Sequence, residues 1–189
     1  MPVTQGKLAL GFSTGVTVSK DSDDVYTAIM LNEILGGSAS SKLFLNVREK
    51  LSLCYYCSSS YSIYSGVMLI SSGFEVKNYE IARKAIFAQL DDIRQGKISD
   101  VEFWAAQRSI TSSYRQLYDS PFDLQAFFGD RSLFGINDNI EDTVSKLLSV
   151  TKKNIVDLAN RIKFEASYFI KGTRSTDVEN SDNTEELYE

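Results

Sequence analysis

The spacing of apolar side chains marks out a strand and a buried helix at the start of the chain. Residues 5–14 alternate between apolar and polar positions, with Leu8, Leu10 and Phe12 on one face. This alternation predicts a strand. Across residues 25–35 the apolar positions recur with a helical period on more than half of the circumference. We therefore expect a helix that is buried on most sides.

A Gly/Ser-rich turn and a second helix follow. Gly36 and Gly37 predict the end of the first helix, because glycine adopts the left-handed conformation that closes a helix C-terminus. The serines within residues 38–41 can cap the next helix. Its predicted apolar stripe consists of Leu43, Phe44, Val47 and Leu51. Arg48 lies at the border between this stripe and a polar face.

The period then changes to two, which predicts a β-hairpin. One face of its first strand carries Leu53, Tyr55, Cys57, Tyr61 and Ile63. Residues 67–74 form the second strand, and Ser65 and Gly66 between the two make a turn dipeptide.

Four further helices and a closing strand complete the predicted order. Residues 79–95 predict one helix, which Gly96 ends. A capping box of Ser99 and Glu102 predicts the start of the next helix, Ser120 before Pro121 the start of a third, and a cap at Thr151 the start of a fourth. Residues 164–170 alternate as a last strand. Strands early, helices in the middle and a final strand predict an α+β fold, an antiparallel β-sheet with helices packed against it.

The helix that starts at Pro121 is rich in phenylalanine. The four positions are Phe122, Phe127, Phe128 and Phe134. Clusters of this kind usually fill a domain interior, so core packing is the favoured interpretation. The alternative is a stripe that lines a peptide cleft or meets a partner lobe.

Size and charge set the class of protein. The 189 residues suffice for one domain with a substantial core, which we expect over residues 1–172. Residues 173–189 carry one basic and six acidic side chains, which account for the whole formal charge of −5, and we expect a disordered tail there. The electroneutral body lacks the basic surplus of a nucleic-acid-binding protein. No stretch reaches the roughly 18 apolar residues of a membrane span, so we expect a cytoplasmic protein without nucleic-acid or membrane partners.

The chain contains no histidine. This absence excludes an H-x-x-E-H zinc site and any serine or cysteine triad that uses a histidine base. The segment from Met30 to Ile34 has Glu33 but apolar residues where imidazoles would be needed. We therefore expect no metal and no catalytic residue in this chain.

Two pairs of residues are candidates for chemistry. Arg48 near a helix end and Tyr55 near a strand start could direct a guanidinium and a phenol toward one peptide carbonyl or carboxylate. The alternative is a salt-bridged arginine and a half-buried tyrosine. Cys54 and Cys57 form C-Y-Y-C, but in a strand their side chains would point to opposite faces, so we expect buried free thiols. An independent redox function would require the two cysteines to oxidise as a pair.

The central run resembles a signature of the pitrilysin/insulinase family of zinc peptidases, which includes the mitochondrial processing peptidases. In that family a lobe without metal carries a pattern close to L-G-G-x-x-S-S-R-L-F-x-x-[LV]-R-E-x-x-G-L-x-Y. The matching residues are Leu35, Gly36, Gly37, Ser40, Ser41, Leu43, Phe44, Arg48, Glu49, Leu53 and Tyr55. Lys42 replaces the usual arginine and Ser52 the usual glycine. The likeness extends more weakly over residues 5–172.

The resemblance implies a function and a set of partners. It implies one lobe of a LuxS/processing-peptidase-like metallohydrolase, the non-catalytic lobe, in which Arg48 and Tyr55 bind the peptide substrate. Zinc would then be held by a sister lobe or a partner subunit. The alternative is an inert scaffold or heterodimer subunit of the same family. The equivalent strand begins the second of two similar lobes in the family, so we expect an excised second half. Such a lobe would expose a face that is normally covered, so a homodimer is also possible.

Overall fold

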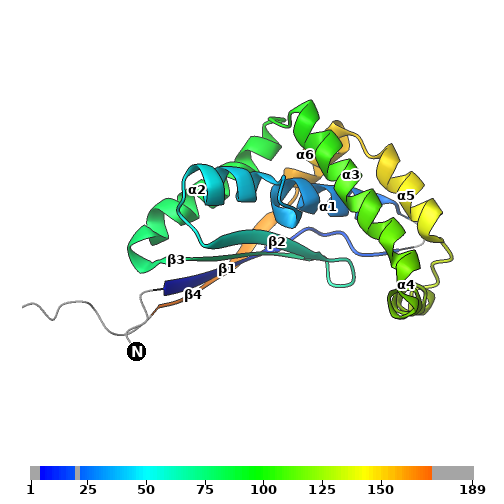
Figure 1. The fold of residues 1–189 in the computed structure, drawn as a ribbon. Helices are drawn as coiled ribbons and strands as arrows, with labels where there is room; N and C mark the ends of the chain where they lie inside the picture. The colour runs from blue at the N-terminus through cyan, green and yellow to red at the C-terminus, as the bar shows by residue number, and fades with distance from the viewer. Residues whose placement is uncertain (1–4, 20–21, 172–189) are drawn as a thin grey trace, which may run out of the picture.

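Four strands form one antiparallel sheet in the order β2-β3-β1-β4 (Figure 1). The strands are β1 (Gln5–Ser13), β2 (Tyr56–Ser62), β3 (Val67–Glu75) and β4 (Lys163–Ile170). The computed structural model describes residues 5–19 and 22–171. Strand β1 is central, since Leu10 pairs with Ile70 of β3 on one side and with Ser167 of β4 on the other. The alternating face of β1 is buried as predicted.

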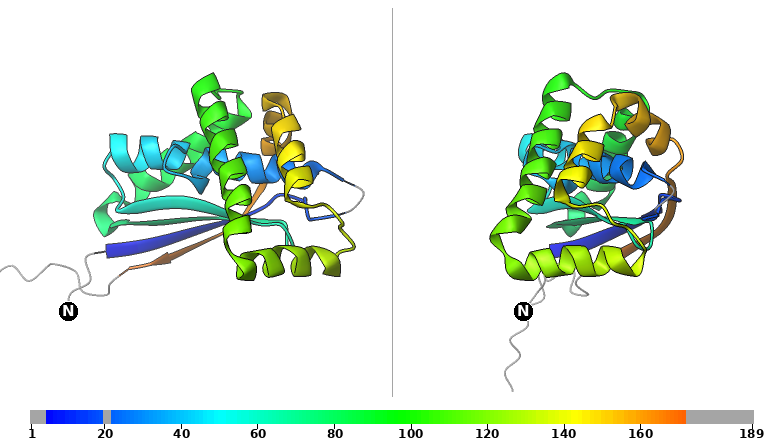
Figure 2. Two further views of the ribbon diagram at one scale, coloured as in Figure 1. Left: turned by 45° about the vertical axis from the view of Figure 1, so that its right-hand side comes forward. Right: turned by 90° about the vertical axis from the view of Figure 1, so that its right-hand side faces the viewer.

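The helices cover one face of this sheet. They are α1 (Asp24–Asn32), α2 (Tyr79–Arg94), α3 (Asp100–Gln116), α4 (Pro121–Leu133), α5 (Ile140–Ser149) and α6 (Lys152–Ala159). Two π-helical segments, η1 (Glu33–Gly37) and η2 (Leu43–Lys50), and two 3₁₀ turns, η3 (Val76–Asn78) and η4 (Leu117–Asp119), complete the described elements. Helix α4 lies apart from the helical layer, at the far end of α3 (Figure 2). The predicted α+β fold is confirmed.

Most start and stop signals in the sequence are confirmed. Ser99 and Glu102 form the expected capping box of α3, and Ser120 caps α4 with Pro121 in the first turn. Gly96, just beyond α2, has a φ of +75°, a backbone conformation that glycine adopts without strain. The sequence reading missed α5, although Asn139 and Asp142 form a capping box at its start.

The first helical segment ends at Gly37 as predicted, but the predicted left-handed conformation of Gly36 and Gly37 is wrong. Both lie within η1, and neither is among the residues with positive φ. The structure shows a different need for a small residue at Gly36. A Cβ built there would lie 2.5 Å from the backbone N of Ser59 and 2.7 Å from Leu43 Cδ1. Glycine is required because the helix segment packs directly on strand β2.

The phenylalanine cluster of α4 does not fill the main core. Phe127 is buried, but in a small separate cluster with Ile140 and Val144 of α5. The other three are exposed: Phe122, Phe128 and Phe134. Core packing was therefore the wrong interpretation for most of the cluster. The reason is tertiary, because α4 contacts α5 through Phe127 but lies outside the main helical layer (Figure 2).

The predicted domain boundary near residue 172 is not tested by the structure. The acidic tail predicted for residues 173–189 lies outside the described residues. Within the described ranges, no helix is long and apolar enough to cross a membrane.

Candidate functional site

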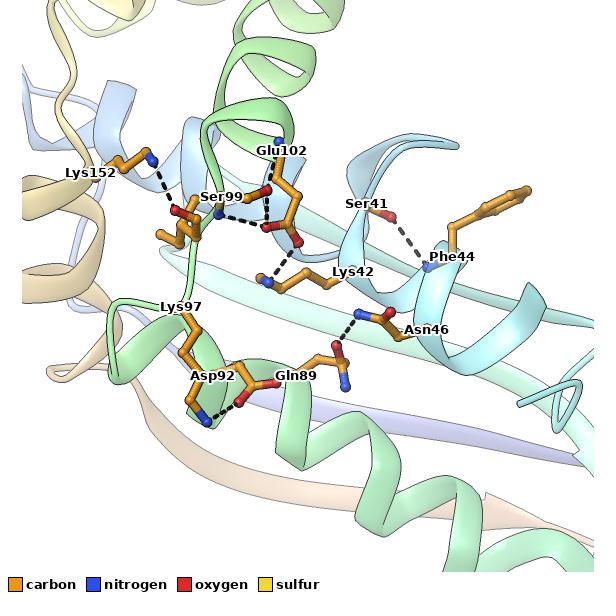
Figure 3. Close-up of polar contacts among 11 residues, drawn as sticks. Ser41, Lys42, Phe44, Asn46, Gln89, Asp92, Lys97, Ser99, Glu102 and Lys152 are labelled. Carbon is orange, nitrogen blue, oxygen red and sulfur yellow. Dashed lines mark hydrogen bonds and ion pairs between the residues drawn. The ribbon is translucent and has the colours of Figure 1, made fainter. Parts of the chain in front are cut away.

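A buried ion pair fixes the start of η2, the segment that carries Arg48. Lys42 Nζ lies 2.6 Å from Glu102 Oε1 of α3, and the two side chains are only 6% and 22% exposed (Figure 3). Lys42 does not belong to the apolar stripe that the sequence predicts for this helix, yet it is buried. The cover comes from the tertiary structure, because α2 packs on η2 and α3 brings Glu102 against Lys42.

The carboxylate of Glu102 binds groups at the start of both α3 and η2. It accepts hydrogen bonds from the backbone N–H and the hydroxyl of Ser99, which cap α3, and from the ammonium of Lys42. Partial burial acts to raise the pKa of the Glu102 carboxyl. The hydrogen bonds from Lys42 and Ser99 outweigh burial and hold that pKa below its usual value. The carboxylate is therefore charged at neutral pH and joins α3 to η2.

A second polar contact orients the middle of η2. Asn46 donates from Nδ2 to Oε1 of Gln89 on α2, over 2.6 Å. Lys42 and Asn46 both point toward α2 and α3, whereas the ring of Phe44 points away from them (Figure 3). The helix thus has a fixed side, held by polar contacts to two other helices, and a side that faces outward.

Arg48 lies on the outward side. Its guanidinium carbon lies 4.6 Å from the centre of the Phe44 ring, a cation–π contact, and its Nε lies 3.6 Å from Glu49 Oε1. The arginine side chain is 40% exposed. The contact with Glu49 is long and solvent-exposed, so it holds the guanidinium weakly. The donors of Arg48 are therefore largely free to bind a ligand.

Tyr55 precedes strand β2 rather than lying within it, because the strand begins at Tyr56. Its backbone N–H donates to the carbonyl of Gly73 at 2.7 Å, whereas its side chain is 52% exposed. The expectation that Tyr55 lies on the same strand face as Cys57 is wrong, because Tyr55 lies outside β2 and is exposed, whereas Cys57 is buried. In the described part of the chain, no hydrogen bond engages its hydroxyl or joins it to Arg48, and convergence of the two side chains stays a prediction.

The sequence reading missed Lys77. This lysine, in η3, forms an exposed ion pair with Glu75 at 2.6 Å, which raises the pKa of Lys77, and the ionised form of Tyr55 would raise it slightly further. It follows strand β3, which pairs with β2, so the sheet brings it near Tyr55. No local pattern could have shown this, since 22 positions separate the two residues.

Cys54 and Cys57 do not point to opposite faces, and that expectation is wrong. Cys54 lies before β2, so strand alternation does not apply to it, and both cysteines are buried free thiols. A hydrogen bond between the two thiols lowers the pKa of Cys54. The same bond, together with burial, raises the pKa of Cys57. The expectation of buried free thiols is confirmed.

The bend between η2 and Tyr55 contains a strained residue. Ser52 has a φ of +49°, the one positive value among the described non-glycine residues, and its hydroxyl donates to the carbonyl of Glu49 at 3.2 Å. A side chain in this left-handed conformation is strained by roughly 1–2 kcal/mol. The residue occupies the position where the resembling signature has glycine.

Ser52→Gly is expected to raise the free energy of unfolding by up to about 1 kcal/mol, because glycine removes the strain but adds freedom to the unfolded chain. Urea titration followed by circular dichroism measures the change. Ser58→Gly, at an exposed extended position of β2, is the matched control and should lower stability by about 0.5–1 kcal/mol. Equal losses in both variants would contradict the interpretation.

The residues present do not fit a zinc site. Met30 and Ile34, on either side of Glu33 along the helix, are buried apolar side chains. Glu33 is itself 6% exposed, with no hydrogen bond or ion pair to its carboxylate within the described ranges. Residues 5–19 and 22–171 contain no group of three or more metal-binding side chains that could hold an ion. No catalytic step is therefore assigned to a metal on this chain.

Comparison with known proteins identifies the family. The model of the peptidase M16 inactive domain matches residues 1–110, which is more than half of the chain. The chain belongs to the peptidase M16 inactive-domain family. This confirms the resemblance to a zinc peptidase lobe without metal.

Individual relatives agree with this assignment. A Bacillus subtilis protein named "Probable inactive metalloprotease YmfF" is 34% identical over 172 residues, which are 90% of this chain and 40% of the relative. The crystal structure of a conserved protein from Enterococcus faecalis V583 superposes with a TM-score of 0.86 at 28% identity, over 94% of this chain and 41% of that one. A peptidase M16 inactive domain from Pseudomonas fluorescens gives a TM-score of 0.76 at 18% identity, over 93% and 43% of the two chains, and shows the fold alone. The chain thus spans about two fifths of the length of the curated relatives it matches.

Proposed function

We propose that this M16 inactive domain is the substrate-contacting, non-catalytic lobe of a zinc endopeptidase. The observation that carries the proposal is the pair of polar side chains on a fixed framework. The backbones that carry Arg48 and Tyr55 are anchored to neighbouring elements, but both side chains are substantially exposed and engaged only weakly. Zinc would be held by a sister lobe or a partner subunit in the cytoplasm.

The two side chains would act by positioning and by electrostatic stabilisation. The Arg48 guanidinium offers several N–H donors in a planar fork, which fits a peptide carbonyl or a terminal carboxylate. The Tyr55 hydroxyl would add one donor near the scissile bond. Neither group takes up or releases a proton in this scheme. Their effect would come from holding the peptide as charge develops on the carbonyl oxygen.

A peptide site at Arg48 and Tyr55 would need a facing lobe to complete it. A groove of about 900 Å³ runs along the exposed side of α2, between Glu80 and Asp91. Neither Arg48 nor Tyr55 lines that groove. Hydrogen bonds from exposed donors are weak in water. Arg48 and Tyr55 would therefore bind a peptide strongly only if a second surface covered the bound peptide and excluded water.

The test uses the full-length protein together with its metal-bearing partner. Zinc is measured by elemental analysis, and cleavage is measured on a fluorogenic peptide library. We expect zinc and cleavage in the assembly, and neither in this chain alone. Arg48→Ala and Tyr55→Phe are each expected to lower kcat/KM by about 10², the effect of losing one donor at a developing oxyanion.

Matched controls separate substrate contact from a structural role. Lys50→Ala removes another exposed cation at the end of η2, and Tyr118→Phe removes an equally exposed hydroxyl elsewhere. Both should leave kcat/KM unchanged, and all four variants should unfold at the wild-type temperature. A metal-free, inert assembly would favour the alternative of an inert scaffold. Loss of stability in parallel with activity would assign Arg48 and Tyr55 to packing instead.

A further inference from the structure

Helix α4 has an apolar side that the described chain leaves uncovered. Phe122 and Leu133, near its two ends, are 78% and 83% exposed. Ala126 and Gly129 lie between them at spacings of four, three and four residues, so all four residues form one stripe along the helix. A Cβ built on Gly129 would meet no atom within 4 Å. We call these four residues the α4 stripe.

The opposite side of α4 already has its partners. Phe127 packs with Ile140 and Val144 of α5, and the guanidinium of Arg131 lies 3.7 Å from the centre of the Phe127 ring. The α4 stripe therefore does not hold α4 on the domain. Large exposed apolar side chains in one stripe indicate a surface that binds another helix.

The two borders of the α4 stripe differ in charge. A rotation of about 100° per residue places Asp123 and Asp130 along one border of the α4 stripe. The same rotation places Gln125 and Ser132 along the other border. All four side chains are exposed. One border thus supplies carboxylates, of which Asp130 already accepts a hydrogen bond from the Tyr64 hydroxyl at 2.9 Å, and the other border supplies neutral hydrogen-bond donors.

We propose that the α4 stripe pairs with the α4 stripe of a second copy of this chain, with the two helices parallel. A two-fold axis along the helices places each acidic border against the neutral border of the other copy. Asp123 then faces Gln125 of the second copy. Asp130, whose Oδ2 is bound by Tyr64 of its own chain, presents Oδ1 to Ser132 of the second copy. An antiparallel pair would place Asp123 against Asp130 of the second copy, and these like charges repel.

The centre of the α4 stripe suits close contact between helices. Ala126 and Gly129 would each meet their own counterpart, and small residues let two helix backbones approach closely. A helix of 13 residues is about 20 Å long at 1.5 Å per residue. One such pair lies below the roughly 1,200 Å² of a standard interface, so we expect a weak, concentration-dependent dimer. The proposal does not depend on peptide binding by Arg48 and Tyr55.

Sedimentation equilibrium of this chain, over about a hundredfold range of concentration, tests the proposal. We expect a monomer–dimer equilibrium in which Phe122→Gln and Leu133→Gln each raise the Kd about tenfold or more. Val101→Gln is the matched control, because Val101 on α3 is also 78% exposed, and it should leave the Kd unchanged. The three variants should unfold like the wild type, since none of the side chains is buried. A monomer at every concentration, or a dimer that both α4 substitutions leave intact, overturns the proposal.

Cysteine cross-linking tests the parallel orientation. Gly129→Cys is expected to form an intermolecular disulfide under mild oxidation, in which two thiols lose two electrons and two protons to the added oxidant. The native cysteines are buried, and Val101→Cys serves as the control for random collision. A disulfide that forms only when Ala126→Cys is mixed with Gly129→Cys would show an antiparallel pair and overturn the orientation. Absence of a dimer in this chain but burial of α4 in the longer protein would assign the α4 stripe to the sister lobe.

Discussion

Lys42→Met is expected to lower the free energy of unfolding by about 3 kcal/mol. The substitution keeps most of the volume of the side chain but removes the ammonium that pairs with Glu102 at 2.6 Å. Removing one partner of a buried ion pair typically costs about 3–5 kcal/mol. The lower end applies because Glu102 keeps its hydrogen bonds to Ser99 and some contact with water. Chemical denaturation at neutral pH measures the loss.

The double variant Lys42→Met with Glu102→Gln isolates the pair. Glutamine can still accept the hydrogen bond from the Ser99 N–H, so the α3 cap survives. Replacing both charges removes the unpaired carboxylate, and we expect the double variant to be about 2 kcal/mol more stable than the sum of the single effects predicts. Strict additivity would mean that the Lys42 ammonium and the Glu102 carboxylate do not stabilise each other.

The same pair predicts a pH dependence. The pKa of Glu102 is lower in the folded chain than in the unfolded chain, because Lys42 and Ser99 bind its charged form. The pair therefore stabilises the fold fully above the unfolded pKa of about 4.3, and its contribution is lost as the pH falls through the folded pKa. The stability difference between wild type and Lys42→Met should narrow below about pH 4. A constant difference from neutral to acidic pH would contradict this assignment.

Gly36→Ala is expected to destabilise the fold by about 3 kcal/mol. The new methyl carbon would lie 2.5 Å from the backbone N of Ser59 and 2.7 Å from both Ser59 Oγ and Leu43 Cδ1. One of these atoms belongs to the backbone of β2, so relief requires η1 to move away from the sheet. Overpacking of this kind lowers the free energy of unfolding by about 1–3 kcal/mol. We expect the upper end of this range, because a backbone atom cannot move aside as easily as the end of a side chain. Thermal unfolding of the purified variant measures the effect.

Gly11→Ala provides the control for Gly36→Ala. Gly11 lies in β1, and a Cβ there would meet only the carbonyl oxygen of Ala166 at 3.8 Å, an ordinary contact. We expect this variant to be within about 1 kcal/mol of the wild type, or slightly more stable. A comparable loss of stability in Gly11→Ala and Gly36→Ala would contradict the interpretation that Gly36 is needed because there is no room for a side chain beside Ser59.

The two large predictions concern the framework of the proposed site. Lys42 and Gly36 fix the two ends of the Gly/Ser turn that leads into η2, one against α3 and the other against β2. Both η1 and η2 are π-helical, a rare geometry that is frequent at functional sites. A loss of peptide contact in Lys42→Met without global unfolding would place the ion pair among the groups that orient Arg48.

The sequence by itself determined the family and most of the elements. Local signals suffice there, since the capping boxes, Gly96 and the alternation of β1 act within a few residues. Only the tertiary structure decided what surrounds each element. It buried Lys42 against a helix 60 positions away, exposed Tyr55 together with Phe122, Phe128 and Phe134, and placed Gly36 on strand β2. Side-chain periodicity shows which face of a segment is apolar, but it does not show which distant segment will cover the other faces.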